Sequence, residues 1–184
     1  MRKLDIPSMT ATQLTRKYGQ GNLSPVEVIE VVFDRIKALN PKLNAFHFMF
    51  EDNAVKAAQK SEERWKSNSA LGPLDGVPTA IKDGLFMKGI PSYRGSAANM
   101  AEHNIPSSNA PVVDRLVDNG AIIVGKTTMC DYGMLASGYS SKFGPTRNPW
   151  NLDYNSGGSS SGSAVAVAAG ICPIIVGTDI VGSI

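Results

Sequence analysis

Short apolar runs alternate with helical patterns from Gly76 to the end of the chain, and this alternation limits the fold more than any other feature. Strand-like runs stand at 77–81, 121–124 and 173–177, and helical patterns at 110–119 and 160–169. Each strand and each helix must bury one apolar face, so such a chain folds into a sheet with helices packed on it. The sequence therefore predicts an α/β fold. Consistent with this division, Gly120 and Gly170 follow the two helical patterns, where a left-handed C-terminal cap favours glycine.

The first part of the chain, residues 1–70, is expected to be mostly helical. Residues 24–27 (SPVE) have the pattern of a capping box with proline at the first helical position. The apolar residues that follow recur at helical spacing until 40–41 (NP), where we expect the helix to end. A second, more polar helix is expected over 51–66, before a break rich in Ser, Asn, Gly and Pro at 67–73. We expect the first of these helices to serve packing and not chemistry.

The composition narrows the class of protein. A hydrophobic content of 42% and a formal net charge of +2, from 18 basic and 16 acidic residues spread along the chain, fit one globular domain without a nucleic-acid or lipid-binding patch. Small neutral ligands are therefore the better expectation. No run approaches the roughly 18 apolar residues of a membrane span, and no apolar segment of a secretion signal follows the basic start. Cys130 and Cys172 lack metal-ligand spacing, so we expect a soluble, cytoplasmic protein without a metal site or disulfides.

Residues 120–127 (GAIIVGKT) match the P-loop pattern of nucleotide-binding proteins. A P-loop follows a strand and cradles phosphate with backbone N–H groups. Here a helical pattern precedes, and the supposed loop consists of apolar, mostly β-branched residues that favour a strand. We therefore interpret Ala121–Val124 as a buried strand and expect no nucleotide there.

Residues 158–162 (GSSSG) match the G-x-S-x-G elbow of α/β-hydrolases, in which the serine relies on an acid and a histidine that come later in the chain. The two histidines, His47 and His103, both precede this segment, so the required chain order fails. We expect His103 to be an exposed loop residue. A histidine base therefore has no source in this arrangement.

Three segments remain that chemistry can join: 76–83 (GVPTAIKD), 156–164 (SGGSSSGSA) and 177–184 (GTDIVGSI). Together they resemble the amidase signature family, whose members hydrolyse carboxamides with a serine nucleophile, a bridging serine in a cis peptide and a lysine. The resemblance extends to 111–129 and 148–151, and more loosely to the N-terminal helices. It implies a mixed β-sheet flanked by helices and a small amide substrate, with no cofactor.

The resemblance assigns the nucleophile to Ser183, the bridging serine to Ser159 and the base to Lys82. A lysine acts as a base only when neutral, and burial favours that form by lowering the pKa. Lys82 follows an apolar, strand-like segment, as burial would require. The oxyanion of the reaction is expected to rest on the backbone N–H groups of Ile180, Val181, Gly182 and Ser183. Supporting roles fall to Gly158, whose bond to Ser159 is expected to be cis, and to Ser160, Thr178 and Asp179.

The sequence departs from the family pattern in two places. Val181 stands where the family most often has glycine, so its side chain is expected to narrow the acyl pocket or shift one N–H donor. After the nucleophile the family continues with an arginine and a long second half, whereas this sequence stops at Ile184. We therefore expect residues 1–184 to be a single α/β domain fragment, with the signature core at 71–184 and the second half of the sheet absent. Such a fragment should hydrolyse amides weakly or not at all.

Three functions compete at this point. The leading one is hydrolysis of a carboxamide to a carboxylic acid and ammonia or an amine through an acyl-serine intermediate. An alternative in the same family is the glutaminase subunit of a tRNA-dependent amidotransferase, which residues 129–132 (MCDY) and Val181 match poorly. From another class, a truncated and non-catalytic chain could bind a ligand or partner through its exposed half-sheet. The sequence leaves a homo-oligomer open in each case.

Overall fold

Three strands form the central sheet, in the spatial order β1 (Phe46–Met49), β3 (Ile122–Thr127), β2 (Pro78–Lys82). The computed structural model describes the chain from residue 3 to residue 184. β3 runs antiparallel to β1 and parallel to β2, so the sheet is mixed, as predicted. Two small antiparallel pairs complete the strands: β4 (Tyr139–Ser140) with β5 (Gly144–Pro145), and β6 (Arg147–Asn148) with β7 (Asn151–Asn155).

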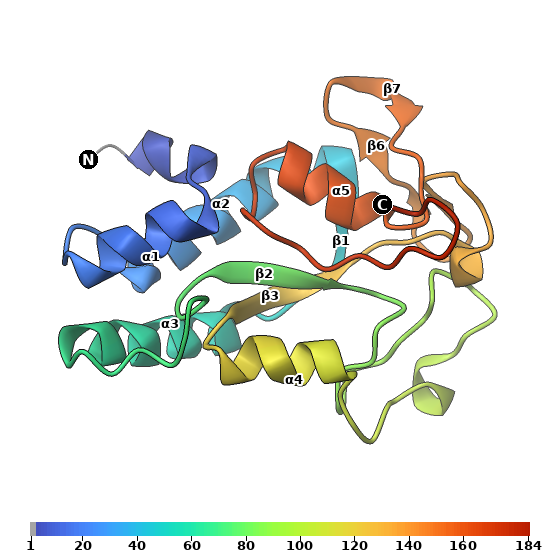
Figure 1. Cartoon of the computed structure of the whole chain (residues 1–184). Coiled ribbons are helices and arrows are strands. Elements are labelled where there is room, and N and C mark those ends of the chain that lie inside the picture. The colour runs from blue at the N-terminus through green and yellow to red at the C-terminus, as the bar shows by residue number, and fades with distance from the viewer. Residues whose placement is uncertain (1–2) are drawn as a thin grey trace.

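Helices cover the sheet on both sides. The α-helices are α1 (Ala11–Gly19), α2 (Pro25–Leu43), α3 (Glu51–Lys66), α4 (Pro111–Asp118) and α5 (Ser161–Ala168). Short 3₁₀ helices are η1 (Lys3–Ser8), η2 (Ala101–His103) and η3 (Asp131–Gly133). In Figure 1, α5 lies above β2 and β3, whereas α3 and α4 lie below them. Over the described residues no helix is both long and apolar enough to cross a membrane.

The helix predicted from the SPVE pattern is α2, and its capping box is present. The Ser24 side chain accepts a hydrogen bond from the Val26 N–H, and the Glu27 side chain accepts one from the Ser24 N–H. The expected end at residues 40–41 is wrong, because the helix continues through Pro41 to Leu43. Pro41 lies in the last turn, where its missing N–H removes a single helical hydrogen bond. Asn44 then ends the helix in the left-handed conformation.

The segment that resembles a P-loop lies in the sheet, as the strand interpretation predicted. Ile122–Thr127 form β3, in which Lys126 pairs with Phe48 on one side and Ile81 on the other. The strand is longer than the predicted 121–124, because Gly125, Lys126 and Thr127 find partners on the neighbouring strands. A segment whose backbone is paired on both sides cannot also cradle phosphate with those N–H groups.

The strand expected at 173–177 is wrong: it reduces to a single bridge between Val176 and Ile81 of β2. The Lys82 N–H donates to Val176 O and the Val176 N–H donates to Ala80 O, both at 3.1 Å. Pro173 has no N–H to extend this pairing. The segment nevertheless runs along the edge of β2, which brings the end of the chain beside Lys82.

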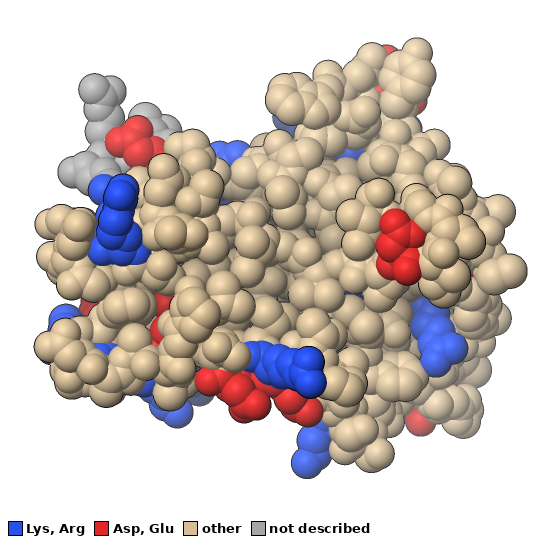
Figure 2. All heavy atoms as spheres, in the orientation of Figure 1, with Lys and Arg blue, Asp and Glu red and all other residues tan. Residues whose placement is uncertain are grey.

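On the face of the molecule shown in Figure 2, charged side chains are dispersed. Figure 2 shows lysines and arginines interspersed with aspartates and glutamates on the visible face, without a broad patch of one sign. Among the residues that the structure describes, no group of three or more His, Cys, Asp or Glu side chains could hold a metal ion.

Candidate functional site

Lys82 is the last residue of β2, and its side chain is fully buried. Its Nζ atom is hydrogen-bonded to Ser159 Oγ at 2.7 Å, Ser160 Oγ at 2.9 Å and Thr178 Oγ1 at 2.8 Å. A longer bond of 3.3 Å reaches Thr178 O. The three segments singled out in the sequence therefore meet at one nitrogen atom.

The fold explains this meeting. Ser159 and Ser160 directly precede α5, which packs against β2 and β3. The bridge at Val176 sets Thr178 beside the end of β2. The peptide bond between Gly158 and Ser159 is cis, as expected from the resemblance.

Ser159 and Ser160 differ in the number of hydrogen bonds that their hydroxyl groups make. The Ser160 hydroxyl donates to Thr178 O and accepts from the Thr178 N–H as well as from Lys82. The Ser159 hydroxyl has Lys82 as its only hydrogen-bond partner within the described part of the chain. Ser159 can therefore pass a proton between Lys82 and a second group, whereas Ser160 holds Lys82 in place.

A cavity of about 220 Å³ lies over these groups and is lined by both Ser159 and Ser183. The remaining lining residues are Gly84, Arg94, Met129, Tyr132, Gly133, Thr178, Ile180 and Val181. Ser183 is half-buried, and its carbonyl accepts a hydrogen bond of 3.2 Å from the Ser160 N–H. The Ser183 hydroxyl has no hydrogen-bond partner among the described residues. The predicted nucleophile and the predicted bridging serine therefore face the same cavity.

The predicted oxyanion site is not open in this conformation. The Asp179 carboxylate accepts the N–H groups of Gly182 at 2.5 Å, Ser183 at 2.7 Å and Ile184 at 3.3 Å. These hydrogen bonds hold the pKa of the Asp179 carboxyl below its usual value, and those from Ser183 and Gly182 contribute most. An oxyanion would have to displace the carboxylate from Gly182 and Ser183. A carboxylate and an oxyanion compete for the same N–H donors. Which of the two these donors face depends on how the chain folds, so the sequence could not show it.

The environment of Lys82 favours its neutral form. Burial lowers the pKa of the Lys82 ammonium from its usual range, and the nearby Cys130 and Asp179 oppose this shift in part. A lysine with a lowered pKa can accept a proton closer to neutral pH than an exposed lysine can.

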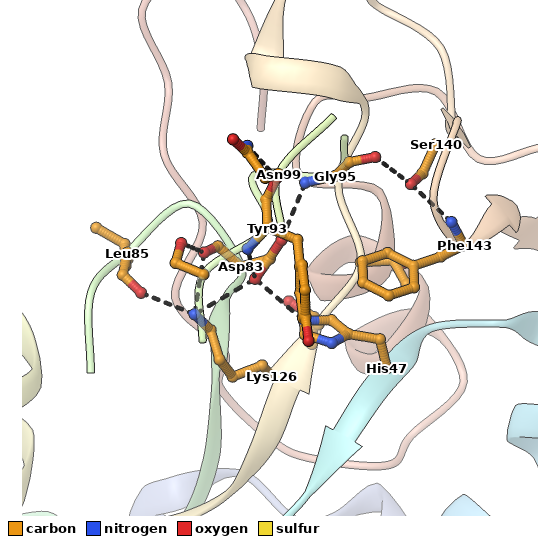
Figure 3. A network of polar contacts seen from close by, with 12 residues as sticks. His47, Asp83, Leu85, Tyr93, Gly95, Asn99, Lys126, Ser140 and Phe143 are labelled. Carbon is orange, nitrogen blue, oxygen red and sulfur yellow. Dashed lines mark hydrogen bonds and ion pairs between the residues drawn. The ribbon is translucent and has the colours of Figure 1, made fainter. Parts of the chain in front are cut away.

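Asp83, the residue after Lys82, is the centre of a buried polar network (Figure 3). Its carboxylate accepts the N–H groups of Tyr93 at 3.2 Å and Gly95 at 2.9 Å. Lys126 Nζ lies 3.4 Å from the carboxylate and donates to Asp83 O at 3.0 Å. His47 Nε2 approaches the carboxylate to 3.2 Å, but its alignment does not make a hydrogen bond. The network fixes the chain immediately after Lys82.

The sequence analysis did not predict this network. Burial alone would raise the pKa of the Asp83 carboxyl, so a buried carboxylate at this position needs charged or hydrogen-bonding partners. The contact with His47, the charge of Lys126 and the Gly95 N–H outweigh burial and hold that pKa below its usual value. The signal was present as two charged residues, Asp83 and Lys126, beside apolar strand segments. His103, by contrast, is exposed in η2, as predicted.

The chain is similar to known proteins in both sequence and fold. A family model described as Amidase matches residues 27–184. A glutamyl-tRNA(Gln) amidotransferase subunit of Acidothermus cellulolyticus is 42% identical over 180 residues, which are 98% of this chain and 35% of that protein. The corresponding protein of the same name from Symbiobacterium thermophilum is 42% identical over 177 residues, or 96% of this chain and 36% of that protein.

Two solved structures show the same fold. A structure of fatty acid amide hydrolase superposes with a TM-score of 0.92 at 32% identity and covers 99% of this chain and 32% of that one. The native peptide amidase from Stenotrophomonas maltophilia has a TM-score of 0.82 at 31% identity and covers 91% of this chain and 35% of that one. The chain thus spans about a third of the length of these proteins, from 32% to 36%.

Proposed function

Because the chain belongs to the amidase family, we propose that it carries the catalytic residues of an enzyme that hydrolyses a carboxamide to a carboxylic acid and ammonia or an amine. One observation supports this above all others. The buried Lys82 Nζ lies within hydrogen-bond distance of Ser159 Oγ, at 2.7 Å, and Ser159 lines the same cavity as Ser183. Burying a lysine beside neutral hydroxyl groups is costly, and such residues are concentrated at functional sites.

The roles follow from what each group can do. Ser183, whose hydroxyl has no hydrogen-bond partner among the described residues, attacks the carbonyl carbon and forms a bond to it. Its proton passes to Ser159 while the Ser159 proton passes to neutral Lys82. The reverse transfer delivers a proton to the departing amine as the C–N bond breaks, and leaves an acyl-Ser183 ester. Water then attacks the ester through the same relay and releases the acid.

Ser160 and Thr178 act by orienting Lys82. Both accept hydrogen bonds from its Nζ, and they also bind each other through the backbone of Thr178. The tetrahedral intermediate would be stabilised by the N–H groups of residues 180–183, once Gly182 and Ser183 turn from Asp179 towards the cavity.

A second candidate is the glutaminase step of an amidotransferase. It is favoured by the names of the relatives above, both of which belong to a glutamyl-tRNA(Gln) amidotransferase. Hydrolysis of glutamine that requires a partner protein would favour this candidate over a stand-alone amidase. In either case we propose a cytoplasmic setting, since Cys130 and Cys172 are both buried and unpaired.

The test is covalent labelling with a serine-directed fluorophosphonate probe, using the protein in its full native length. We expect the probe on Ser183, located by peptide mass spectrometry, and no labelling of the Ser183→Ala variant. Lys82→Met should slow labelling by about 100- to 10,000-fold, the usual contribution of a general base. Ser108→Ala, at an exposed loop serine, is the matched control and should label like the wild type. Undiminished labelling of folded Ser183→Ala would contradict the assignment.

A further inference from the structure

Arg94 is the only charged residue among those that line the cavity of Ser159 and Ser183. Its guanidinium lies over the ring of Phe86, 5.3 Å from the ring centroid. Within the described part of the chain it makes no ion pair. A guanidinium at the edge of a reaction cavity without an anionic partner is available to a ligand.

The backbone at this point is unusual. Arg94 has φ +49°, and Tyr132, which lines the same cavity, has φ +52°. The Tyr132 N–H donates a 2.7 Å hydrogen bond to Arg94 O, so the two left-handed residues hold each other. Residues other than glycine seldom adopt this conformation, and those that do are concentrated at functional sites.

The buried network around Asp83 includes Tyr93 and Gly95 (Figure 3), the two residues that flank Arg94 in the chain. The Asp83 carboxylate binds the N–H groups of Tyr93 and Gly95, on either side of Arg94. Asn99 donates to Tyr93 O at 2.7 Å, and the Ser140 hydroxyl donates to Gly95 O at 2.5 Å. Asp83 also follows Lys82 in the chain, so one hydrogen-bonded network fixes the backbone both after Lys82 and around Arg94. Such pre-organisation favours specific binding.

The nearby carboxylates have other partners. Asp83 is engaged by Lys126, by His47 and by two backbone N–H groups. Asp179 accepts three backbone N–H groups, and Asp131 accepts the hydroxyl and N–H of Ser141. Among the described residues none of these carboxylates forms an ion pair with Arg94.

We propose that Arg94 is a specificity-determining residue that binds a carboxylate carried by the amide substrate. The planar fork of a guanidinium matches a carboxylate with two parallel hydrogen bonds. A cavity of about 220 Å³ suits a small molecule, such as the monoamide of a short dicarboxylic acid. The small net charge led us to expect a neutral ligand. Net charge does not reveal a single arginine that lines the cavity without an ion pair among the described residues. The inference rests on the proposed function for its reaction, but binding alone can test it.

The experiment compares each monoamide of a three- to six-carbon dicarboxylic acid with its neutral methyl ester. In the full-length native protein we expect the best carboxylate substrate to exceed its ester in kcat/KM for amide hydrolysis by about 10- to 100-fold, the usual effect of a charge-assisted bond. Arg94→Asn removes the charge and keeps a residue that tolerates positive φ. It should abolish this preference and leave kcat/KM for the ester within about threefold of the wild type, the same margin as one weak contact.

Two further variants complete the design. Arg94→Lys keeps the charge but loses the fork, so its preference should fall by about 3- to 10-fold. Arg115→Gln removes an exposed arginine from α4 and should leave the preference unchanged. Calorimetry with Ser183→Ala, alone and combined with Arg94→Asn, measures binding of the same ligands without turnover.

The outcomes separate the two proposals. Hydrolysis without a carboxylate preference, or with a preference that Arg94→Asn and Arg94→Lys leave intact, overturns the role of Arg94 and spares the proposed function. Arg94-dependent binding of the carboxylate in a protein that hydrolyses nothing supports Arg94 and overturns the proposed function. If the protein neither binds nor hydrolyses any of these compounds, both proposals are overturned. If Arg94→Asn fails to fold, as seen by circular dichroism, Arg94→Lys decides.

Discussion

Replacing Lys126 by methionine should destabilise the protein strongly, because it removes the cation from a fully buried pair. Lys126 and Asp83 are both inaccessible to solvent, and their charged groups are 3.4 Å apart. Methionine has a similar shape, so the change leaves little cavity and reports mainly on the lost charge. Removing one partner of a buried pair costs about 3–5 kcal/mol.

The structure places this case at the lower end of that range. Asp83 O keeps a hydrogen bond from the Ser92 hydroxyl at 2.6 Å, and the carboxylate keeps the N–H groups of Tyr93 and Gly95. Leu85 O loses the 3.1 Å bond from Lys126, but it is only half-buried and water can replace the donor. We therefore expect a loss of about 3 kcal/mol in the free energy of unfolding.

Urea unfolding followed by far-UV circular dichroism measures this loss. Lys60→Met, at an exposed position of α3, is the matched control and should change the free energy of unfolding by less than about 0.5 kcal/mol. The double variant Asp83→Asn/Lys126→Met removes both charges, so it should be more stable than the sum of the single changes predicts, by at least about 1.5 kcal/mol. A loss below about 1 kcal/mol for Lys126→Met, or additive single changes, would refute the view that the two charges depend on each other.

Two other expectations concern the base and the packing behind the serines. A lysine base works only when deprotonated, so the rate of amide hydrolysis should rise with pH and then level off. Because burial lowers the pKa of Lys82, the plateau should begin below the ordinary lysine value of 10.5. A pH profile of kcat/KM still rising above pH 10.5 would exclude Lys82 as the base. Gly162→Ala should cost about 3 kcal/mol and slow labelling of Ser183, since a Cβ there would lie 2.2 Å from Ala45 O and 2.5 Å from Thr128 N. Gly19→Ala, where the nearest atom is 3.4 Å away, should be nearly neutral in the same unfolding assay, and equal effects of the two changes would contradict this reasoning.

Local sequence patterns predicted the elements that local interactions determine. The capping box placed the start of α2, and helical spacing placed α3, α4 and α5 within one or two residues. Gly120 and Gly170 adopt positive φ after their helices, as the cap argument required. Each of these predictions depends on residues within a few positions of one another.

Strands were harder, because their partners lie far away in the chain. β1 was not predicted, although it pairs with β3 about eighty residues later. The segment 173–177 was predicted as a strand from its apolar residues, but only Val176 found a partner on β2. An apolar run shows that a segment is buried, whereas its neighbours decide whether it becomes a strand.

For the site, the amino-acid sequence by itself predicted, through its resemblance to the amidase signature family, that Lys82, Ser159 and Ser183 carry the chemistry. Only the tertiary structure decided that Lys82 is buried against Ser159 and that Asp179 occupies two of the expected oxyanion donors. It also decided that Arg94 lines the same cavity and has no ion pair among the described residues. The physical reason is that a motif fixes the kind of group, while pKa, access and charge balance depend on neighbours brought from distant parts of the chain.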